Sequence, residues 1–177
     1  MSKGPSLNLA KITFAMAIGA SSILTLAHAQ TDPLQAVEKI ELNKYLGTWH
    51  EVVRKPLYFQ RKCDSNVIAN YSLNKNGNIK VDNSCYTKDG KFKQTIGEAF
   101  VQNAPSNSKL KVSFLPKIIR WLPVGRGDYW VLKIDENYET VLVGEPDKKY
   151  MWILSRSQQP QPEVVQEYLN YAESIGY

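Results

Sequence analysis

Residues 49–156 form a series of short runs in which apolar and polar residues alternate, and turn residues separate one run from the next. The clearest run is 109–114, because its apolar residues Leu110, Val112 and Phe114 fall on one face of an extended strand. No long stretch of this segment has the periodicity of a helix. The pattern predicts an antiparallel barrel or sandwich, with one face of each strand towards water and the other towards a core or cavity.

Eight strands are expected from the spacing of these runs. Their predicted ranges are 48–54, 67–73, 78–86, 93–102, 109–115, 128–135, 139–144 and 150–156. After Pro162 the period changes to that of a helix, and we expect this helix to pack on the outside of the strands. The residues that share its apolar stripe are Val164, Val165, Tyr168, Leu169, Ala172 and Ile175.

A tryptophan at the start of the first strand has a counterpart at the end of the last. Trp49 follows Gly47 and Thr48, and Arg156 ends the eighth run. A tryptophan at the start of a first strand and an arginine at the end of a last one suggest that these two strands meet in a closed barrel. A closed barrel is a container for a small apolar ligand, and nothing in the chain demands a catalyst.

The first 29 residues have the form of a signal peptide, with a basic start, an apolar segment at 12–26 and small residues at Ala27 and Ala29. A membrane anchor is the alternative, but the apolar segment has about 15 residues and a spanning helix needs roughly 20. The mature chain, residues 30–177, is predicted to be one domain that is periplasmic or secreted. No cysteine lies near the cleavage site, so we expect no lipid anchor and leave association with the outer membrane open.

The charge of the mature chain is mild, because removing two lysines and no acids leaves 20 basic and 17 acidic residues, a net charge of +3. This argues against a nucleic-acid partner. The chain has two cysteines, Cys63 and Cys85, and an exported protein favours a disulfide between them over two free buried thiols. The hairpin turn predicted at 74–77 brings them towards each other. No metal-ligand spacing or cofactor motif is present.

Three motifs, in order, resemble the lipocalin family. They are Gly47-x-Trp49 after a short helical turn, residues 135–138 between the sixth and seventh strands, and residues 154–156 at the end of the eighth. The resemblance covers about residues 38–176, and segments 70–73 and 150–156 are similar to the bacterial branch of that family. It implies an all-β fold: an eight-stranded antiparallel up-and-down barrel with a C-terminal helix outside. Gly47, Trp49 and Arg156 are then structural, with Trp49 plugging the closed end.

The same resemblance implies reversible binding of fatty acids, lysophospholipids or similar lipids, for storage or transport that maintains the membrane. Alternation from Trp49 predicts that Glu51 and Val53 face the lumen and that His50 faces outwards. The predicted ligand-lining residues are Glu51, Tyr71, Val112, Phe114, Trp121 and Trp152. Glu51 either anchors a polar ligand group or is held by a neighbouring tyrosine or water, and the inward apolar residues are either lining or ordinary core.

The loop 116–127 combines apolar residues, Trp121 among them, with Lys117, Arg120 and Arg126. In the resembled fold it lies at the open mouth of the barrel beside residues 55–59 and 145–147. Such a mixture favours an anionic membrane surface or a lipid headgroup. A lid over the barrel and a homodimer contact are the alternatives.

Enzymatic activity on the same scaffold is the remaining alternative. It would need a polar catalytic set inside the barrel, and Glu51 is the one candidate. We therefore predict a binding protein rather than an enzyme.

Overall fold

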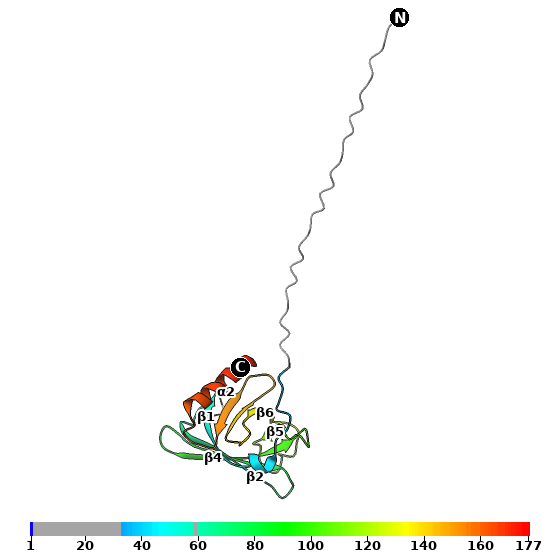
Figure 1. Ribbon diagram of the computed structural model, residues 1–177. Helices are drawn as coiled ribbons and strands as arrows, with labels where there is room; N and C mark the ends of the chain where they lie inside the picture. The colour runs from blue at the N-terminus through cyan, green and yellow to red at the C-terminus, as the bar shows by residue number, and fades with distance from the viewer. Residues whose placement is uncertain (2–32, 59) are drawn as a thin grey trace. The chain divides into compact units, whose positions relative to one another are not determined.

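The computed structural model describes residue 1, residues 33–58 and residues 60–177. The signal peptide predicted at 1–29 lies outside the described residues, apart from residue 1. Eight antiparallel strands pair in sequence order, and the last pairs with the first, so they form a closed barrel (Figure 1). They are β1 (Gly47–Arg54), β2 (Ser65–Leu73), β3 (Ile79–Tyr86), β4 (Phe92–Val101), β5 (Lys109–Ser113), β6 (Arg126–Ile134), β7 (Thr140–Gly144) and β8 (Met151–Ser155). The predicted fold is confirmed, and each strand begins and ends within two residues of its predicted range.

Because neighbouring strands run in opposite directions, the loops between them alternate between the two ends of the barrel. The loops at 55–64, 87–91, 114–125 and 145–150 share the end that we call the open end. The other end is closed by the segment before β1, which includes the short helix α1 (Leu42–Tyr45). Ile40 of that segment donates its N–H to the carbonyl of Ser106, and the Tyr138 hydroxyl accepts the N–H of Glu41.

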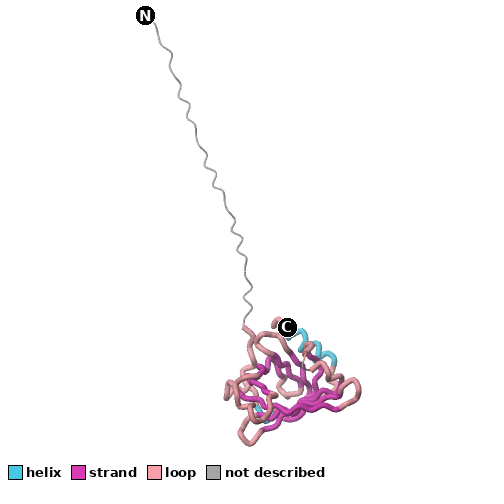
Figure 2. The backbone as a smooth tube through the Cα atoms, turned by 180° about the vertical axis from the view of Figure 1, so that it is seen from behind, coloured by secondary structure: helices cyan, strands magenta, loops and turns pink. Residues whose placement is uncertain are grey.

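Apolar side chains pack on both faces of the barrel wall. The inner cluster lies inside the barrel, and its fully buried members include Ile40, Trp49, Val131, Val141 and Val143. The outer cluster lies between the barrel and the helix α2 (Pro162–Ser174), which Figure 2 shows against one side of the strands. The outer cluster joins Leu132, Leu142, Met151 and Ile153 of the strands to Tyr168 and Ala172 of α2. The predicted C-terminal helix on the outside of the barrel is therefore confirmed.

A disulfide joins Cys63, in the loop after β1, to Cys85 near the end of β3, with their Cα atoms 5.6 Å apart. β2, which follows Cys63, pairs with β3, which contains Cys85. The two strands pair in one register from Ile68 onwards, and this register shifts between Ser65 and Ile68. Asn66 lies at this shift with a positive φ of 48°. This bend brings Cys63 over Cys85, and the predicted pairing is confirmed.

In the part of the chain that the structure describes, no helix combines the length and the apolar character that a membrane crossing requires.

Candidate functional site

A pair of residues from the first and last strands holds the closed end of the barrel: Trp49 lies in β1, and Arg156 directly follows β8. The Trp49 side chain is 0% exposed, and the guanidinium of Arg156 lies 3.8 Å from the centre of its ring. Arg156 also donates hydrogen bonds of 2.7, 2.9 and 2.7 Å to backbone carbonyls. The accepting residues are Lys44, Leu46 and Thr48. The pair thus ties α1, β1 and β8 together at this end.

Three tyrosines lie together inside the barrel next to Trp49, and we call this layer the floor. The Tyr129 hydroxyl lies 2.6 Å from that of Tyr45 and 3.1 Å from that of Tyr71. Burial raises the pKa of Tyr71 to about 12 and the pKa values of Tyr45 and Tyr129 well above their usual value. The floor is therefore uncharged, and its hydroxyls bond to one another. Tyr71 was predicted to line the cavity, and the structure places it in this floor.

The other predicted apolar lining residues lie at different depths. Val112 and Trp152 pack against the inner cluster. Phe114 follows the end of β5 and is 43% exposed, with its ring against Gly97 of β4, where a Cβ atom would come within 2.7 Å of it. Phe114 thus lies at the mouth of the barrel rather than in the buried wall.

A β-bulge in β1 reverses the faces of the residues that follow it. The register shifts between Glu51 and Val53, so Val53 lies opposite Ile153 of the outer cluster, and Arg54 lies opposite Trp152 of the inner one. The prediction that Val53 faces the lumen is wrong, because it extended strict alternation across a bulge. Bulges re-aim side chains in this way. Here the bulge turns Arg54 towards the inside.

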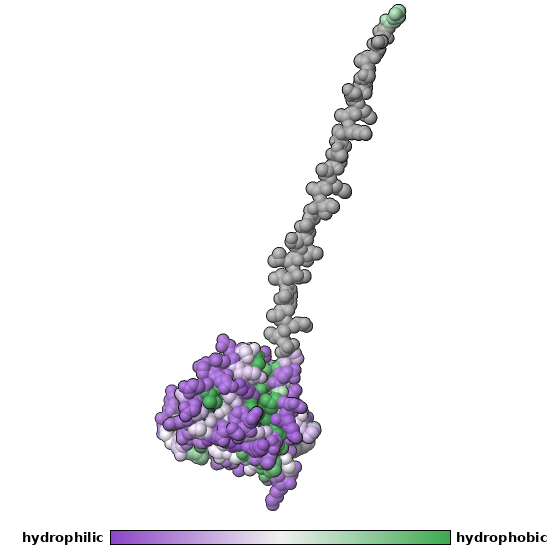
Figure 3. All heavy atoms as spheres, viewed as in Figure 1, coloured by the Kyte–Doolittle hydropathy of each residue, from purple (hydrophilic) through white to green (hydrophobic). Residues whose placement is uncertain are grey.

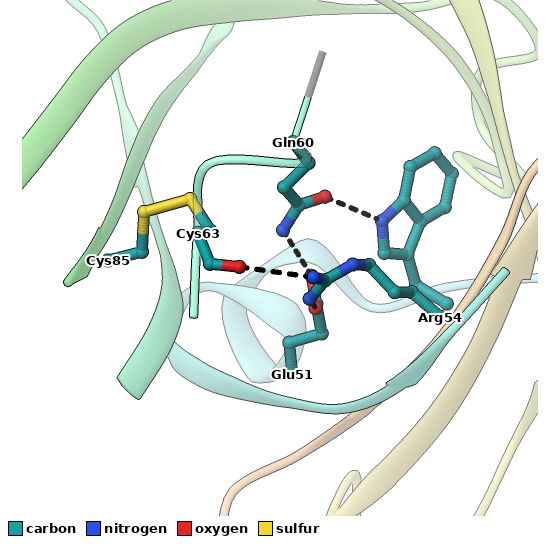
Figure 4. Close-up of polar contacts among 6 residues, drawn as sticks. Glu51, Arg54, Gln60, Cys63 and Cys85 are labelled. Atoms are coloured by element: carbon teal, nitrogen blue, oxygen red, sulfur yellow. Dashed lines mark hydrogen bonds and ion pairs between the residues drawn. A yellow bond between two sulfur atoms is a disulfide. The ribbon is translucent and has the colours of Figure 1, made fainter. Parts of the chain in front are cut away.

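Glu51 is the centre of a polar cluster on this inner wall (Figure 4). Its side chain is 7% exposed, and its carboxylate accepts hydrogen bonds from the Arg54 guanidinium and from Gln60 Nε2, the latter at 2.5 Å. The Gln60 amide oxygen lies 3.4 Å from the indole nitrogen of Trp152, and Arg54 also donates to the Cys63 carbonyl at 3.3 Å. Among the described residues, the partners that hold the carboxylate are therefore an arginine and a glutamine.

Arg54 and Gln60 were not identified from the sequence. A buried carboxylate needs a cationic or hydrogen-bonding partner, since an uncompensated charge is costly inside a protein. That rule applied to Glu51 points to the nearest cation along the chain, which is Arg54. The bulge that places it was not visible in the sequence pattern.

The loop that contains Trp121 lies at the open end, and its apolar side chains face solvent. Trp121 is 72% exposed and Ile118 is 82% exposed. Arg120 donates hydrogen bonds of 2.8 Å to the carbonyls of Leu115 and Ile96, and the Arg126 guanidinium lies 3.8 Å from the centre of the Phe100 ring. The two arginines therefore fasten the loop to β4. Trp121, which was predicted to line the cavity, therefore faces solvent rather than the inside of the barrel.

Acidic residues stand at another part of the mouth. Burial and the neighbouring carboxylates of Asp147 and Asp128 raise the pKa of Glu145 to about 7. Its carboxylate lies beside Gly127, where a Cβ atom would be 3.5 Å away. Among residues 33–58 and 60–177, no group of three or more His, Cys, Asp or Glu side chains is arranged to hold a metal ion. Because its pKa is raised to about 7, Glu145 is a carboxyl group at the mouth that titrates near neutral pH.

A closed eight-stranded barrel with one plugged end, an apolar inner wall and a polar cluster near its mouth defines a small-ligand-binding β-barrel. Residues 40–177 match the family model described as a lipocalin-like domain. The chain belongs to the lipocalin family. Members of this family generally bind or carry small hydrophobic molecules, and membership implies such a ligand here.

Three similar proteins support the assignment to the lipocalin family over most of the chain. Outer membrane lipoprotein Blc of Escherichia coli K12 is 34% identical over 166 residues, 92% of this chain and 89% of that protein. Temperature-induced lipocalin-1 of Arabidopsis thaliana is 36% identical over 146 residues, 81% and 77% of the two chains. Apolipoprotein D of Bos taurus is 37% identical over 134 residues, 72% and 67% of the two chains.

Among solved structures, insecticyanin from the tobacco hornworm Manduca sexta is similar, with a TM-score of 0.62 and 22% identity. The match covers 80% of this chain and 78% of that one. At this identity the likeness supports the barrel fold alone.

Proposed function

We propose that the protein reversibly binds fatty acids, lysophospholipids or similar single-chain lipids in its barrel and stores or transports them for membrane maintenance. The observation that carries the proposal is the division of the barrel along its axis. Trp49 and the three tyrosines plug one half, and polar groups that include Glu51 and Arg54 stand towards the other. An amphipathic molecule with its chain in the lumen and its polar end at the mouth fits this division.

The energy for uptake comes from the acyl chain. Each CH₂ group that leaves water for an apolar lumen contributes about 0.8 kcal/mol. An inner wall built from apolar side chains discriminates weakly between chains that differ by one methylene. We therefore propose a class of single-chain lipids rather than one molecule.

Native mass spectrometry of the purified protein tests this function. A retained ligand whose mass matches a fatty acid or lysophospholipid is expected, and the same spectrum reports whether the protein is a monomer or a homodimer. Uptake of a neutral fluorescent probe, N-phenylnaphthylamine, and its displacement by a fatty acid is the second measurement. A protein that carries no lipid and takes up no probe would contradict the proposal.

The proposed location is the cell envelope, on the periplasmic or secreted side. The predicted signal peptide supports it, and so does the similarity to a protein named as an outer membrane lipoprotein. Fractionation of cells that produce the full chain, with detection of a new N-terminus at Gln30, is the corresponding experiment.

A second candidate function is docking on a membrane surface through the open end, with the barrel as its support. It is favoured by the exposed apolar side chains of the loop 114–125, which include Phe114, Ile118, Trp121 and Val124. On the face shown in Figure 3 most of the surface belongs to hydrophilic residues, and the hydrophobic residues form separate patches. Sedimentation of the protein with anionic vesicles tests this candidate. The two functions are compatible, because a carrier has to meet the membrane that it supplies.

A further inference from the structure

The bulge in β1 gives the mouth of the barrel a cation that strict alternation would have placed outside. Arg54 lies opposite Trp152 on β8, on the inner face, because the register shifts between Glu51 and Val53. Bulges are local features that cost regular ladder hydrogen bonds, and they are over-represented at the rims of barrels and beside functional sites. The inward direction of the Arg54 side chain is therefore a consequence of the bulge in β1.

Arg54 is only partly used by the protein itself. Its guanidinium has five N–H groups, of which one donates to Glu51 and one to the Cys63 carbonyl. The remaining three have no partner among the described residues. Since Glu51 also receives a hydrogen bond from Gln60, its negative charge is shared between two donors. Arg54 can thus bind a further anion without breaking its bond to Glu51.

A second guanidinium lies at the same place. A pocket of about 370 Å³ is lined by Arg54, Pro56, Leu57 and Arg61. Arg61 stacks on the Tyr58 ring at 4.2 Å and forms no ion pair within the described part of the chain. Two arginines and one carboxylate, that of Glu51, leave a local charge of +1. Leu57 is buried and Pro56 is apolar, so the pocket joins a cationic wall to an apolar one.

We propose that Arg54 and Arg61 bind the anionic headgroup of a single-chain amphiphile whose acyl chain lies in the lumen. Guanidinium groups match carboxylate and phosphate oxygens, because their N–H donors lie in a planar fork. This inference rests on the proposed function, which supplies the lumen for the chain. It moves the headgroup from the Trp121 loop to the loop between β1 and β2, since the Arg120 and Arg126 guanidiniums fasten the Trp121 loop to Ile96 and Phe100 of β4.

The test compares two ligands that have the same chain and differ in headgroup charge. Laurate and 1-dodecanol displace N-phenylnaphthylamine from the protein, and the ratio of their affinities reports the headgroup site alone. In the unmodified protein laurate is expected to bind more tightly. In Arg61→Gln the affinity for laurate should fall about tenfold, the effect of one charge-assisted hydrogen bond, while the affinity for dodecanol is unchanged.

Lys62→Gln is the matched control, because it removes the same charge from the neighbouring position outside the pocket. It should leave both affinities as they are. Glu51→Gln should raise the ratio of the affinity for laurate to that for dodecanol. Without the competing carboxylate of Glu51, Arg54 should bind the laurate carboxylate more tightly. A role of Glu51 in packing alone would not raise that ratio.

The outcomes separate the two proposals. If the laurate-to-dodecanol ratio in Arg61→Gln equals that of the unmodified protein, the headgroup site is wrong and the lumen still binds lipid. If Lys62→Gln lowers the ratio as much as Arg61→Gln, the effect comes from general surface charge and the site is again wrong. If the unmodified protein takes up neither the probe nor either ligand, the proposed function itself fails.

Discussion

At the scale of single residues, Arg156 connects more of the fold than any motif position around it. It stacks on Trp49 and donates to carbonyls on both sides of Gly47, whose φ of 95° favours glycine at that turn. Arg156→Lys keeps the charge but loses the planar stack and the fixed fork of donors. We expect the free energy of unfolding to fall by about 2 to 3 kcal/mol, measured by urea denaturation.

The control for this variant is Arg61→Lys, since the Arg61 side chain is exposed. Its effect should stay within about 0.5 kcal/mol, as for surface substitutions in general. Equal stability of the two variants would show that the cation-π pair and its carbonyl bonds do not hold the closed end.

Glu145 predicts a dependence of stability on pH. Burial first, and then the carboxylates of Asp147 and Asp128, raise its pKa from 4.5 to about 7. Between these two values the folded state holds a proton that the unfolded chain releases, so the free energy of unfolding falls as pH rises from 4.5 to 7. After allowance for solvent screening of this half-exposed group, the loss is about 1 kcal/mol.

Glu145→Gln removes this contribution, and the variant should be more stable than the unmodified protein at pH 8 and about equal to it at pH 5. Urea denaturation at the two pH values is the measurement. Glu136→Gln, an exposed substitution at the closed end, should leave the pH dependence unchanged. A Glu145→Gln variant with the full pH dependence would contradict the assignment to this residue.

The inner wall of β1 shows which residue positions a sequence can predict. Trp49 and Glu51 face inwards as alternation requires, because the strand is regular up to Glu51. Val53 and Arg54 exchange faces because one extra residue is inserted against β8. No glycine or proline stands next to that insertion, in the run from His50 to Arg54, to mark it. The inward position of Glu51 could therefore be predicted. The inward position of Arg54 could not, because it depends on the bulge.

At the scale of elements, the disulfide between Cys63 and Cys85 joins the loop between β1 and β2 to β3. This loop contains Arg61 of the pocket and Cys63, whose carbonyl accepts a hydrogen bond from Arg54. It closes a segment with a sequence separation of 22 residues. On the chain-entropy view, closing a loop of this length stabilises the folded state by about 3 kcal/mol. The double variant Cys63→Ser, Cys85→Ser should lose about that amount in urea denaturation.

Reduction of the unmodified protein should give the same loss as the double variant, which excludes an effect of the serines. Because the Cys63 carbonyl accepts from Arg54, we also expect the preference for laurate over dodecanol to weaken when the bridge is absent. Unchanged stability after full reduction would contradict the stabilising role of the bridge.

The strands and the helix could be predicted because each has a strong local signal. Alternation defines the strand faces, and Pro162 followed by an apolar stripe defines α2. The residues of α2 that touch the barrel were less well predicted: Tyr171 packs in the outer cluster, and Val165, placed on the stripe by its spacing, is not among the side chains of that cluster. The side of α2 that contacts the barrel depends on the curvature of the barrel wall. The sequence of the helix alone does not predict that curvature.

At the scale of the whole molecule, charge is divided between the two ends of the barrel. The open-end loops, 55–64, 87–91, 114–125 and 145–150, contain nine basic and four acidic residues, a net charge of +5. The closed-end segments, 38–46, 74–78, 102–108, 135–139 and 156–161, contain four basic and five acidic residues, a net charge of −1. The net charge of the chain hides this difference, because the topology is needed to sort the loops. An anionic surface would therefore attract the open end.

Large apolar side chains follow the same division. Tyr58, Ile118 and Trp121 are exposed in open-end loops, whereas the exposed Leu73 lies at the opposite end of β2. The double variant Ile118→Ser, Trp121→Ser should bind vesicles that contain phosphatidylglycerol at least about tenfold more weakly, since each buried apolar side chain contributes about 1.5 kcal/mol or more. Sedimentation with the vesicles measures this, and uptake of N-phenylnaphthylamine should not change.

Leu73→Ser removes an apolar side chain that is 57% exposed at the other end, and it should leave vesicle binding as it is. Added salt should weaken binding of the unmodified protein, because the charge of the open end acts through screened attraction. If Leu73→Ser reduces binding as much as the double variant, the protein has no preferred end towards the membrane. If only the double variant does, the mouth of the barrel faces the bilayer, which places the Arg54 and Arg61 pocket where a lipid leaving the membrane would enter.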